Sequence, residues 1–153
     1  RCCCKTRKLS ESERYSIIQR VAMSRIDELI QEKLSKDGQV LSLKAQFIRE
    51  VGARELAKHE ALKNLQALDL TQNDIGDDGV KALAESPIFS NLRSLNLKSN
   101  QISDKGATYL AESKTLTKLR AVQLVVNDIS EEGEKKLRNS TSLVSLSSLK
   151  FRV

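Results

Sequence analysis

Few residues of this 153-residue sequence have the chemistry that catalysis or metal binding requires. His59 is the only histidine, so a multi-histidine metal site is impossible and acid–base chemistry would depend on carboxylates or lysines. No glycine-rich loop of the phosphate-binding type is present. The carboxylates of Asp74, Asp77, Asp78 and Asp128 fall at predicted turns into helices, which is typical of charges at helix N-termini. We therefore predict a protein that is not an enzyme and uses no cofactor or metal.

The three cysteines, Cys2, Cys3 and Cys4, are adjacent in a basic tail, residues 1–9. Adjacent thiols cannot join distant parts of a fold, and no separated cysteine is available for a zinc site. Because bases surround them, the tail is similar to a juxtamembrane flank, in which thiols accept lipid and bases face anionic headgroups. The alternatives are a disordered tail or the arbitrary start of a fragment, since the sequence begins with Arg rather than Met. Free thiols favour an intracellular compartment, at the cytosolic face of a membrane if the tail is acylated.

The excess of 26 basic over 20 acidic residues belongs mostly to that tail, because the charges of residues 37–153 nearly balance. A folded domain that binds nucleic acid presents a basic face, and five aromatic residues are too few for a channel of stacked bases. No apolar run reaches the roughly 18 residues of a membrane-spanning helix. We expect no nucleic-acid partner.

The strongest pattern is a repeat of 27 residues without insertions. The first complete unit consists of Leu62, Leu65, Leu68, Leu70, Asn73, Ile75, Gly79 and Leu83. The next two consist of Phe89, Leu92, Leu95, Leu97, Asn100, Ile102, Gly106 and Leu110, and of Leu116, Leu119, Val122, Leu124, Asn127, Ile129, Gly133 and Leu137. A partial unit with Leu41, Leu43, Gln46, Ile48, Gly52 and Leu56 precedes them, and a half-unit with Leu143, Leu146, Leu149 and Phe151 follows.

Each repeated position has a physical role. The paired leucines form a short strand with both side chains in the core, and the asparagine after them can bond backbone groups of neighbouring turns. The segments 77–85, 104–112 and 131–138 have acids in or near their first turn, which predicts helices. A glycine within a helix costs about 1 kcal/mol relative to alanine, so its recurrence predicts close approach to an adjacent element.

These residues resemble the leucine-rich repeat, and the continuation from Ile75 to Ala84 is similar to the ribonuclease-inhibitor-like subclass. The resemblance covers residues 40–153 and implies an α/β fold, a right-handed βα solenoid with a parallel concave sheet and convex helices. Residues 37–153 would then be the repeat domain, with about five units of which the first and last are incomplete. Gln46 departs from the pattern because it replaces the asparagine, which suits a terminal repeat.

The segment 10–36 is predicted to be an N-terminal cap, with one helix from Ser10 to Leu34. Ser10 and Glu13 form a capping-box pattern, and an apolar stripe at helical spacing follows. Such a helix would cover the apolar end of the first repeat.

The residues that flank the core leucines of each strand point onto the concave sheet and are our candidate partner-binding site. They are Lys44, Asp69, Thr71, Asn96, Lys98, Gln123, Val125, Lys150 and Arg152. The lysines and Arg152 could meet acidic side chains, and for any one residue the alternative is a solvated face without a ligand. The uncovered last half-unit is a second candidate, because an open strand edge invites pairing.

The favoured hypothesis is a non-catalytic protein-interaction module or structural subunit that binds a protein through the concave sheet or the solenoid ends. One alternative is a regulatory activator of a small GTPase, because activators of the Ran GTPase share the repeat subclass. Another is a membrane-tethered scaffold that uses the cysteine-rich tail as its anchor.

Overall fold

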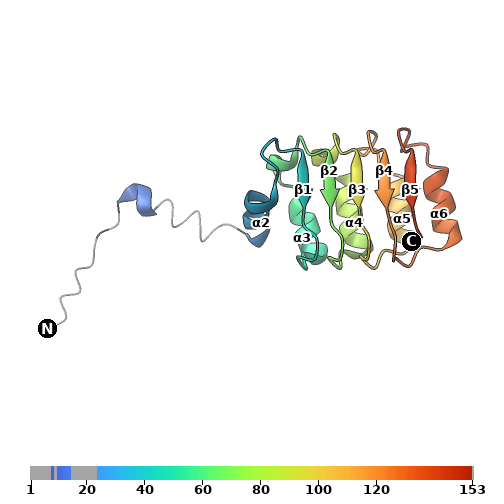
Figure 1. Ribbon diagram of the computed structural model, residues 1–153, viewed down its shortest axis with the longest axis horizontal. Helices are drawn as coiled ribbons and strands as arrows, with labels where there is room; N and C mark the ends of the chain where they lie inside the picture. Colours follow the sequence, from blue (N-terminus) through green and yellow to red (C-terminus); the bar gives the residue numbers. More distant parts are fainter. Residues whose placement is uncertain (1–7, 9, 15–23, 153) are drawn as a thin grey trace.

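The computed structural model describes residue 8, residues 10–14 and residues 24–152, and it shows a row of parallel strands backed by a row of helices (Figure 1). The strands are β1 (Val40–Ser42), β2 (Ala67–Asp69), β3 (Ser94–Asn96), β4 (Ala121–Gln123) and β5 (Ser148–Lys150). The helices are α2 (Arg25–Lys33), α3 (Arg49–Leu56), α4 (Gly76–Glu85), α5 (Asp104–Ala111) and α6 (Glu131–Arg138), and the 3-10 turns are η1 (Glu60–Leu62) and η2 (Pro87–Phe89).

The sheet follows the chain order β1-β2-β3-β4-β5, and every neighbouring pair is parallel. Its register repeats the sequence period, since Leu41 lies beside Leu68, Leu68 beside Leu95, and Leu95 beside Val122. Each strand is followed by a crossover helix, up to α6 before β5. The predicted α/β solenoid is confirmed, and each coil of it consists of one strand and the connection that leads to the next.

One continuous core lies between the sheet and the helices. The repeated leucines from Leu41 to Leu124 are almost completely buried, as are Ile75 and Ile102 beyond the turns. Phe89 is the largest fully buried side chain and fills the position that Leu62 and Leu116 have in their coils. Repeated burial of the same positions stabilises every coil only through contact with its neighbours.

The repeated asparagines form a single file of hydrogen bonds, as the sequence predicts. The side-chain oxygen of Asn100 accepts the backbone N–H of Asn73, and its amide donates to the carbonyl of Leu70 in the preceding coil. Asn127 accepts the backbone N–H of Asn100 in the same way. Each buried amide therefore joins two coils and pairs backbone groups that would otherwise be unsatisfied.

A second set of repeated bonds joins the helix N-termini. Asp77 at the start of α4 accepts the backbone N–H groups of Ser103 and Gly106 in the next coil, at 2.8 and 3.1 Å. A Cβ atom on Gly106 would stand 2.6 Å from the Asp77 carboxylate, so the helices approach closely where the sequence predicts it. Asp104 bonds the backbone N–H and hydroxyl of Ser130 at the equivalent place.

A third set of hydrogen bonds lies at the C-terminal ends of the helices, and the sequence pattern did not predict it. The hydroxyls of Ser113 and Ser140 donate to the carbonyls of Ala84 and Ala111, the last residues or nearly the last residues of the preceding helices. Ser86 bonds the carbonyl of Ala57 in the same manner. The orphan carbonyls of each helix end are thus satisfied by the following coil.

The expectation of one continuous helix over residues 10–34 is wrong at Ser24. Ser24 has an extended backbone and is the N-cap of α2, with a capping box in which Ser24 and Asp27 bond one another's backbone. The predicted pair of bonds between Ser10 and Glu13 is present, and residues 11–14 are helical. A new helix begins at Ser24, because its hydroxyl accepts the backbone N–H of Asp27 in the first turn of α2. The buried side chains of α2 are Ile26, Leu29 and Ile30, which join the core of the solenoid.

The first and last coils differ from the central three. The side-chain amide of Gln46 donates to the carbonyl of Lys44, so it does not reach back as Asn73 does. At the other end, β5 contains the half-buried Leu149 and is followed by the half-buried Phe151, and within residues 24–152 no helix comes after it.

Candidate interaction surface

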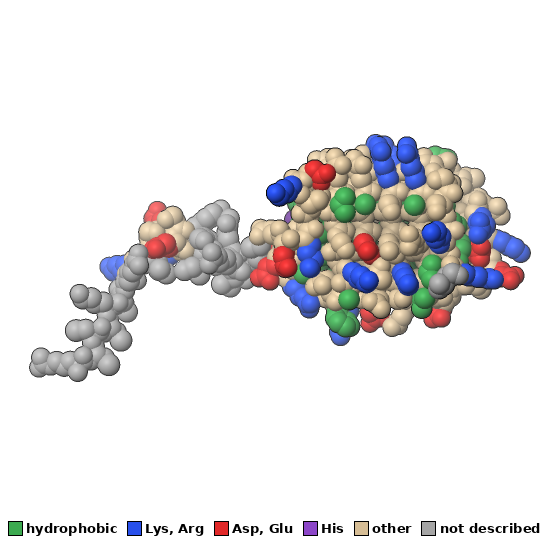
Figure 2. Space-filling model, in the orientation of Figure 1, with side chains coloured by type: hydrophobic (Ala, Val, Ile, Leu, Met, Phe, Trp, Pro, Cys, Tyr) green, Lys and Arg blue, Asp and Glu red, His purple; other side chains and the backbone are tan. Residues whose placement is uncertain are grey.

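The sheet brings the nine predicted partner-binding residues onto five adjacent strands and the turns that follow them, although they span more than one hundred positions of sequence. We call the outward side of the sheet the sheet face (Figure 2). Lys44, Lys98 and Lys150 are exposed on it, on the alternate coils of β1, β3 and β5. The side chains of Asp69, Asn96 and Gln123 are half-buried between them.

Two of the nine residues are buried, so they offer a partner almost no surface. Thr71 is 6% exposed and Val125 is 7% exposed. Thr71 donates its hydroxyl to Asp69 at 2.6 Å, and the same carboxylate oxygen accepts the backbone N–H of Thr71. Asn96 bonds the backbone N–H of Lys98 equivalently. Asp69 and Asn96 therefore hold the turns at the strand ends, a structural role that strand alternation alone did not reveal.

The lysines of the sheet face have no counter-charge. Lys44, Lys98 and Lys150 form no ion pair within the described part of the chain, whereas Arg54 and Arg138 pair with glutamates of their own helices. Asp69 is the one acidic residue among the outward positions of the five described strands, and its carboxylate already accepts a hydrogen bond from the Thr71 hydroxyl. Blue side chains accordingly outnumber red ones over the sheet in Figure 2. A rigid, basic and unpaired surface is what an acidic partner requires.

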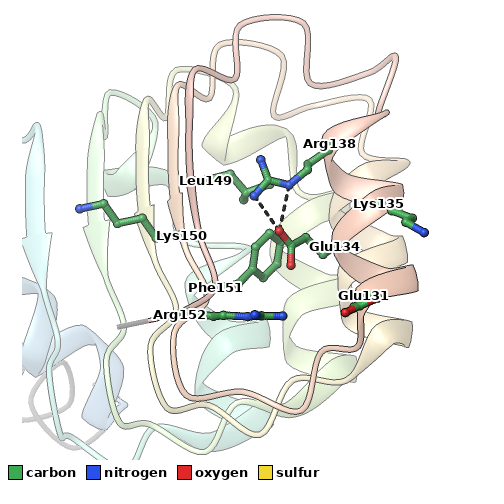
Figure 3. A pocket seen from close by; sticks show the side chains of 8 residues that line it. All are labelled: Glu131, Glu134, Lys135, Arg138, Leu149, Lys150, Phe151 and Arg152. Carbon is green, nitrogen blue, oxygen red and sulfur yellow. Dashed lines mark hydrogen bonds and ion pairs between the residues drawn. The ribbon is translucent and has the colours of Figure 1, made fainter.

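Arg152 points to a different place from the lysines. Figure 3 shows Lys150 on the sheet side of β5, while Arg152 extends toward the side of α6. Arg152 lines a pocket at the end of the solenoid with Glu131, Glu134, Arg138 and Phe151. Arg138 pairs with Glu134 at 2.6 Å and lies 6.0 Å from the centre of the Phe151 ring. Charged side chains of α6 and Arg152 therefore line the open end that the sequence predicts.

Two exposed apolar residues were missed because they lie outside the strand pattern. Phe47 is 69% exposed and Val126 is 60% exposed, and both follow a strand at the turn toward the helices. Both have a left-handed backbone, with φ of 51° and 59°. A bulky or β-branched residue rarely adopts this conformation, which costs about 1 kcal/mol or more. Comparison of equivalent positions between the repeats would have found them.

His59 connects α2 to the first coil. Its Nε2 lies 2.8 Å from Asp27 Oδ1, and its Nδ1 is buried without a hydrogen-bond partner among the described residues. The backbone N–H of Ser24 lowers the pKa of Asp27, and the hydrogen bond from His59 adds to this effect, while burial opposes it. His59 itself lies in the connection between α3 and η1.

The carboxylates of Asp77 and Asp104 at the helix starts also have a structural role, because each accepts hydrogen bonds from the next coil. The hydroxyl of Ser130 lowers the pKa of Asp104, and the backbone N–H of Ser130 acts in the same direction. Within residues 24–152 and the short described N-terminal parts, no group of three or more His, Cys, Asp or Glu residues could hold a metal ion. No helix of these described parts is long and apolar enough to cross a membrane. Cys2, Cys3 and Cys4 lie outside the described residues, so their acylation stays a prediction.

Comparison with known proteins agrees with the repeat geometry. A family model described as leucine-rich repeat matches residues 61–84 and 90–111, which include β2 with α4 and β3 with α5. A comparison with curated proteins found no match. The matched segments coincide with coils whose strands, asparagines and helices superpose in register along one solenoid. The chain therefore contains leucine-rich repeats, with two of them at residues 61–84 and 90–111.

Proposed function

We propose that this protein is a non-catalytic interaction module that binds an acidic protein partner through its sheet face. Leucine-rich repeats generally mediate protein–protein interaction, and this family is typically non-enzymatic. The observation that carries the proposal is the set of three exposed lysines, Lys44, Lys98 and Lys150, without ion pairs in the described chain. They stand on alternate coils of a rigid parallel sheet, so an arriving partner does not have to order the backbone beneath them.

The partner must contribute more than charge. Exposed ion pairs are worth about 0–1 kcal/mol each, so three lysines alone give weak binding and mainly accelerate encounter. The other outward strand residues are small or polar except for the exposed Val40 at the start of β1, and none is aromatic. The sheet face therefore supplies orientation and selection by charge, and apolar contact has to come from its borders.

The experiment is affinity purification from cells that express the protein, followed by direct binding measurements with the purified partner. Lys98→Glu combined with Lys150→Glu should weaken binding at least tenfold and abolish its salt dependence. The matched control is Lys105→Glu with Lys114→Glu, which makes the same change of net charge at exposed residues away from the sheet. Unchanged binding by the sheet-face variant would show that recognition does not use this surface.

We also propose that the repeats belong to the ribonuclease-inhibitor-like subclass. Helices of 8–10 residues in the central coils support this assignment, together with the recurrent isoleucine, glycine and leucine of the connection. Activation of a small GTPase stays a prediction that a turnover assay across a panel of GTPases tests. Membrane tethering stays a prediction that mass spectrometry of Cys2, Cys3 and Cys4 tests.

A further inference from the structure

The turns that follow the strands form a second border of the sheet face, which we call the strand-exit edge. In Figure 2 apolar, basic and acidic side chains all lie along the lower border of the sheet, where the chain leaves it for the helices. The edge includes the exposed residues Lys44, Phe47, Lys98 and Val126. It adjoins the sheet face and shares Lys44 and Lys98 with it.

The repeats themselves show that the fold does not require Phe47 or Val126. The position of Phe47 is filled by Asp74, Gln101 and Asp128 in the other coils, and that of Val126 by Ala45, Gln72 and Ser99. Most of these residues adopt the same left-handed backbone. Polar residues therefore build the same turn, and they do so with side chains that water solvates.

Phe47 and Val126 oppose the fold in two ways. Their backbone conformation disfavours bulky and β-branched side chains, and their apolar surface faces solvent instead of the core. Neither side chain belongs to the hydrophobic core. Contact with another molecule would bury both side chains. It would also explain why an aromatic and a β-branched residue occur at turn positions that disfavour them.

We propose that the strand-exit edge binds an extended segment of the partner protein with the pattern apolar–x–acidic–x–apolar. This proposal rests on the proposed function and specifies the partner's chemistry. Phe47 and Val126 belong to coils three strand spacings apart, which is about 14 Å along the edge. Four residues of extended chain span about 13 Å and return the side chain to the same side.

The acidic residue in the middle of the segment is matched by Lys98. Lys98 belongs to the coil of β3, between the coils of Phe47 and Val126, and it forms no ion pair within the described residues. Asp74 and Asp128 also lie in these turns, at the repeat position that Phe47 has in the first coil. The coil of β3 has Gln101 at this position instead of an aspartate, so an acidic residue placed over this coil meets Lys98 without a carboxylate of the same turn.

The probe is a fluorescein-labelled peptide with the core leucine–serine–glutamate–serine–leucine, and binding is measured by fluorescence anisotropy on the whole protein. Two peptide controls replace the glutamate by lysine or both leucines by serine. The protein variants are Phe47→Asn and Val126→Asn, because asparagine suits the left-handed backbone. Val144→Ser is the matched control, since Val144 is 76% exposed and precedes β5 at the opposite border of the sheet.

We expect the peptide to bind, and each asparagine variant to weaken binding about tenfold, which corresponds to about 1.4 kcal/mol. The thermal midpoint should stay constant or rise, because the substitutions relieve the backbone, and Val144→Ser should bind like the unchanged protein. A midpoint lowered by several degrees would assign the two side chains a structural role and overturn the proposal. Absence of binding at millimolar peptide, or binding insensitive to both asparagine variants, would overturn it as well.

Two patterns of results separate this proposal from the one on which it rests. If Lys98→Glu with Lys150→Glu abolishes binding of the purified partner while both asparagine variants bind it normally, the sheet face is confirmed and the strand-exit edge is refuted. If both asparagine variants weaken binding of the peptide and of the partner while Lys150→Glu alone leaves partner binding unchanged, the sheet-face proposal fails and the strand-exit edge stands.

Discussion

The repeated asparagines connect individual residues to the stability of the whole sheet. Asn100 is fully buried and makes hydrogen bonds to Asn73, Leu70 and Lys98. No hydrophobic residue can replace it, because the backbone groups of two coils would lose their partners in a water-free interior.

We therefore expect Asn100→Ala to lower the free energy of unfolding by about 2–3 kcal/mol, measured by urea denaturation. The control is Asn91→Ala, since Asn91 also bonds a carbonyl of the preceding coil, that of Lys63, but at an exposed site. A loss for Asn100→Ala no larger than that of the control would contradict the role of the asparagine file.

Asp104 gives the molecule a pH-dependent bond between two coils. Its pKa is lowered from 3.8 by the Ser130 hydroxyl and backbone N–H, so its ionised form is favoured in the folded state. This contribution is complete at pH values above the unfolded pKa near 3.8 and is lost as the pH falls through the lower folded value.

Ser130→Ala should raise the pKa of Asp104 toward its ordinary value, because the largest of its causes is removed. NMR titration of the Asp104 carboxyl measures the shift, and Thr141→Ala, at an exposed turn, is the control. An unchanged Asp104 titration in Ser130→Ala would mean that the hydroxyl does not bond the carboxylate in solution.

At the scale of elements, α2 is attached to the solenoid by apolar and polar contacts together. Ile26, Leu29 and Ile30 are buried, and Asp27 both caps the helix and lies against His59. Because a cap of this kind contributes about 1 kcal/mol, α2 depends on it more than a longer helix would.

Asp27→Ala should increase amide hydrogen exchange of α2 about fivefold to tenfold while exchange in α4 and α5 stays constant, since 1 kcal/mol of local stability changes the open fraction by this factor. The control is Glu28→Ala, which changes an exposed carboxylate in the same helical turn. Equal protection of α2 in both variants would argue against the attachment.

The contact between α4 and α5 reverses an ordinary helix preference. Alanine normally stabilises a helix interior by about 1 kcal/mol relative to glycine. At Gly106, however, the added methyl group would collide with the Asp77 carboxylate that bonds the Gly106 N–H.

Gly106→Ala should therefore lower the thermal midpoint instead of raising it. Lys105→Ala, at an exposed position of the same helix, is the control and should change the midpoint little. A higher midpoint for Gly106→Ala would show that the two helices pack less closely than the structure indicates.

For the whole molecule, stability depends on position along the solenoid. A central coil contacts neighbours on both sides, whereas among the described strands β5 pairs with β4 only. Leu95 is 1% exposed, and its equivalent Leu149 in β5 is only partly buried.

Leu95→Ala should lower the free energy of unfolding by about 2–5 kcal/mol, as for other buried leucines. Leu149→Ala should cost less than half as much, because its side chain is already partly solvated and the site can relax. Chemical denaturation of the two variants gives the comparison, and equal losses would contradict a stability gradient toward β5.

The sequence by itself determined the repeating part of the protein. The 27-residue period predicted the strand positions, the asparagine file and the close approach at Gly106, because each coil repeats the same local contacts and therefore the same residue types. The helix break at Ser24 was not predicted, because an apolar stripe indicates a helical face but not whether a capping bond interrupts it.

Only the tertiary structure decided which side chains are available to a partner. Alternation along a strand assigned Thr71 and Val125 to the outside, but neighbouring coils and turns cover them. It also assigned Arg152 to the sheet face, although the chain has left the strand there and turns the side chain toward α6. The neighbouring coils leave the side chains of Phe47 and Val126 exposed and place no acidic partner against Lys98. Solvent exposure depends on how the coils pack together, and residue spacing along one strand does not reveal it.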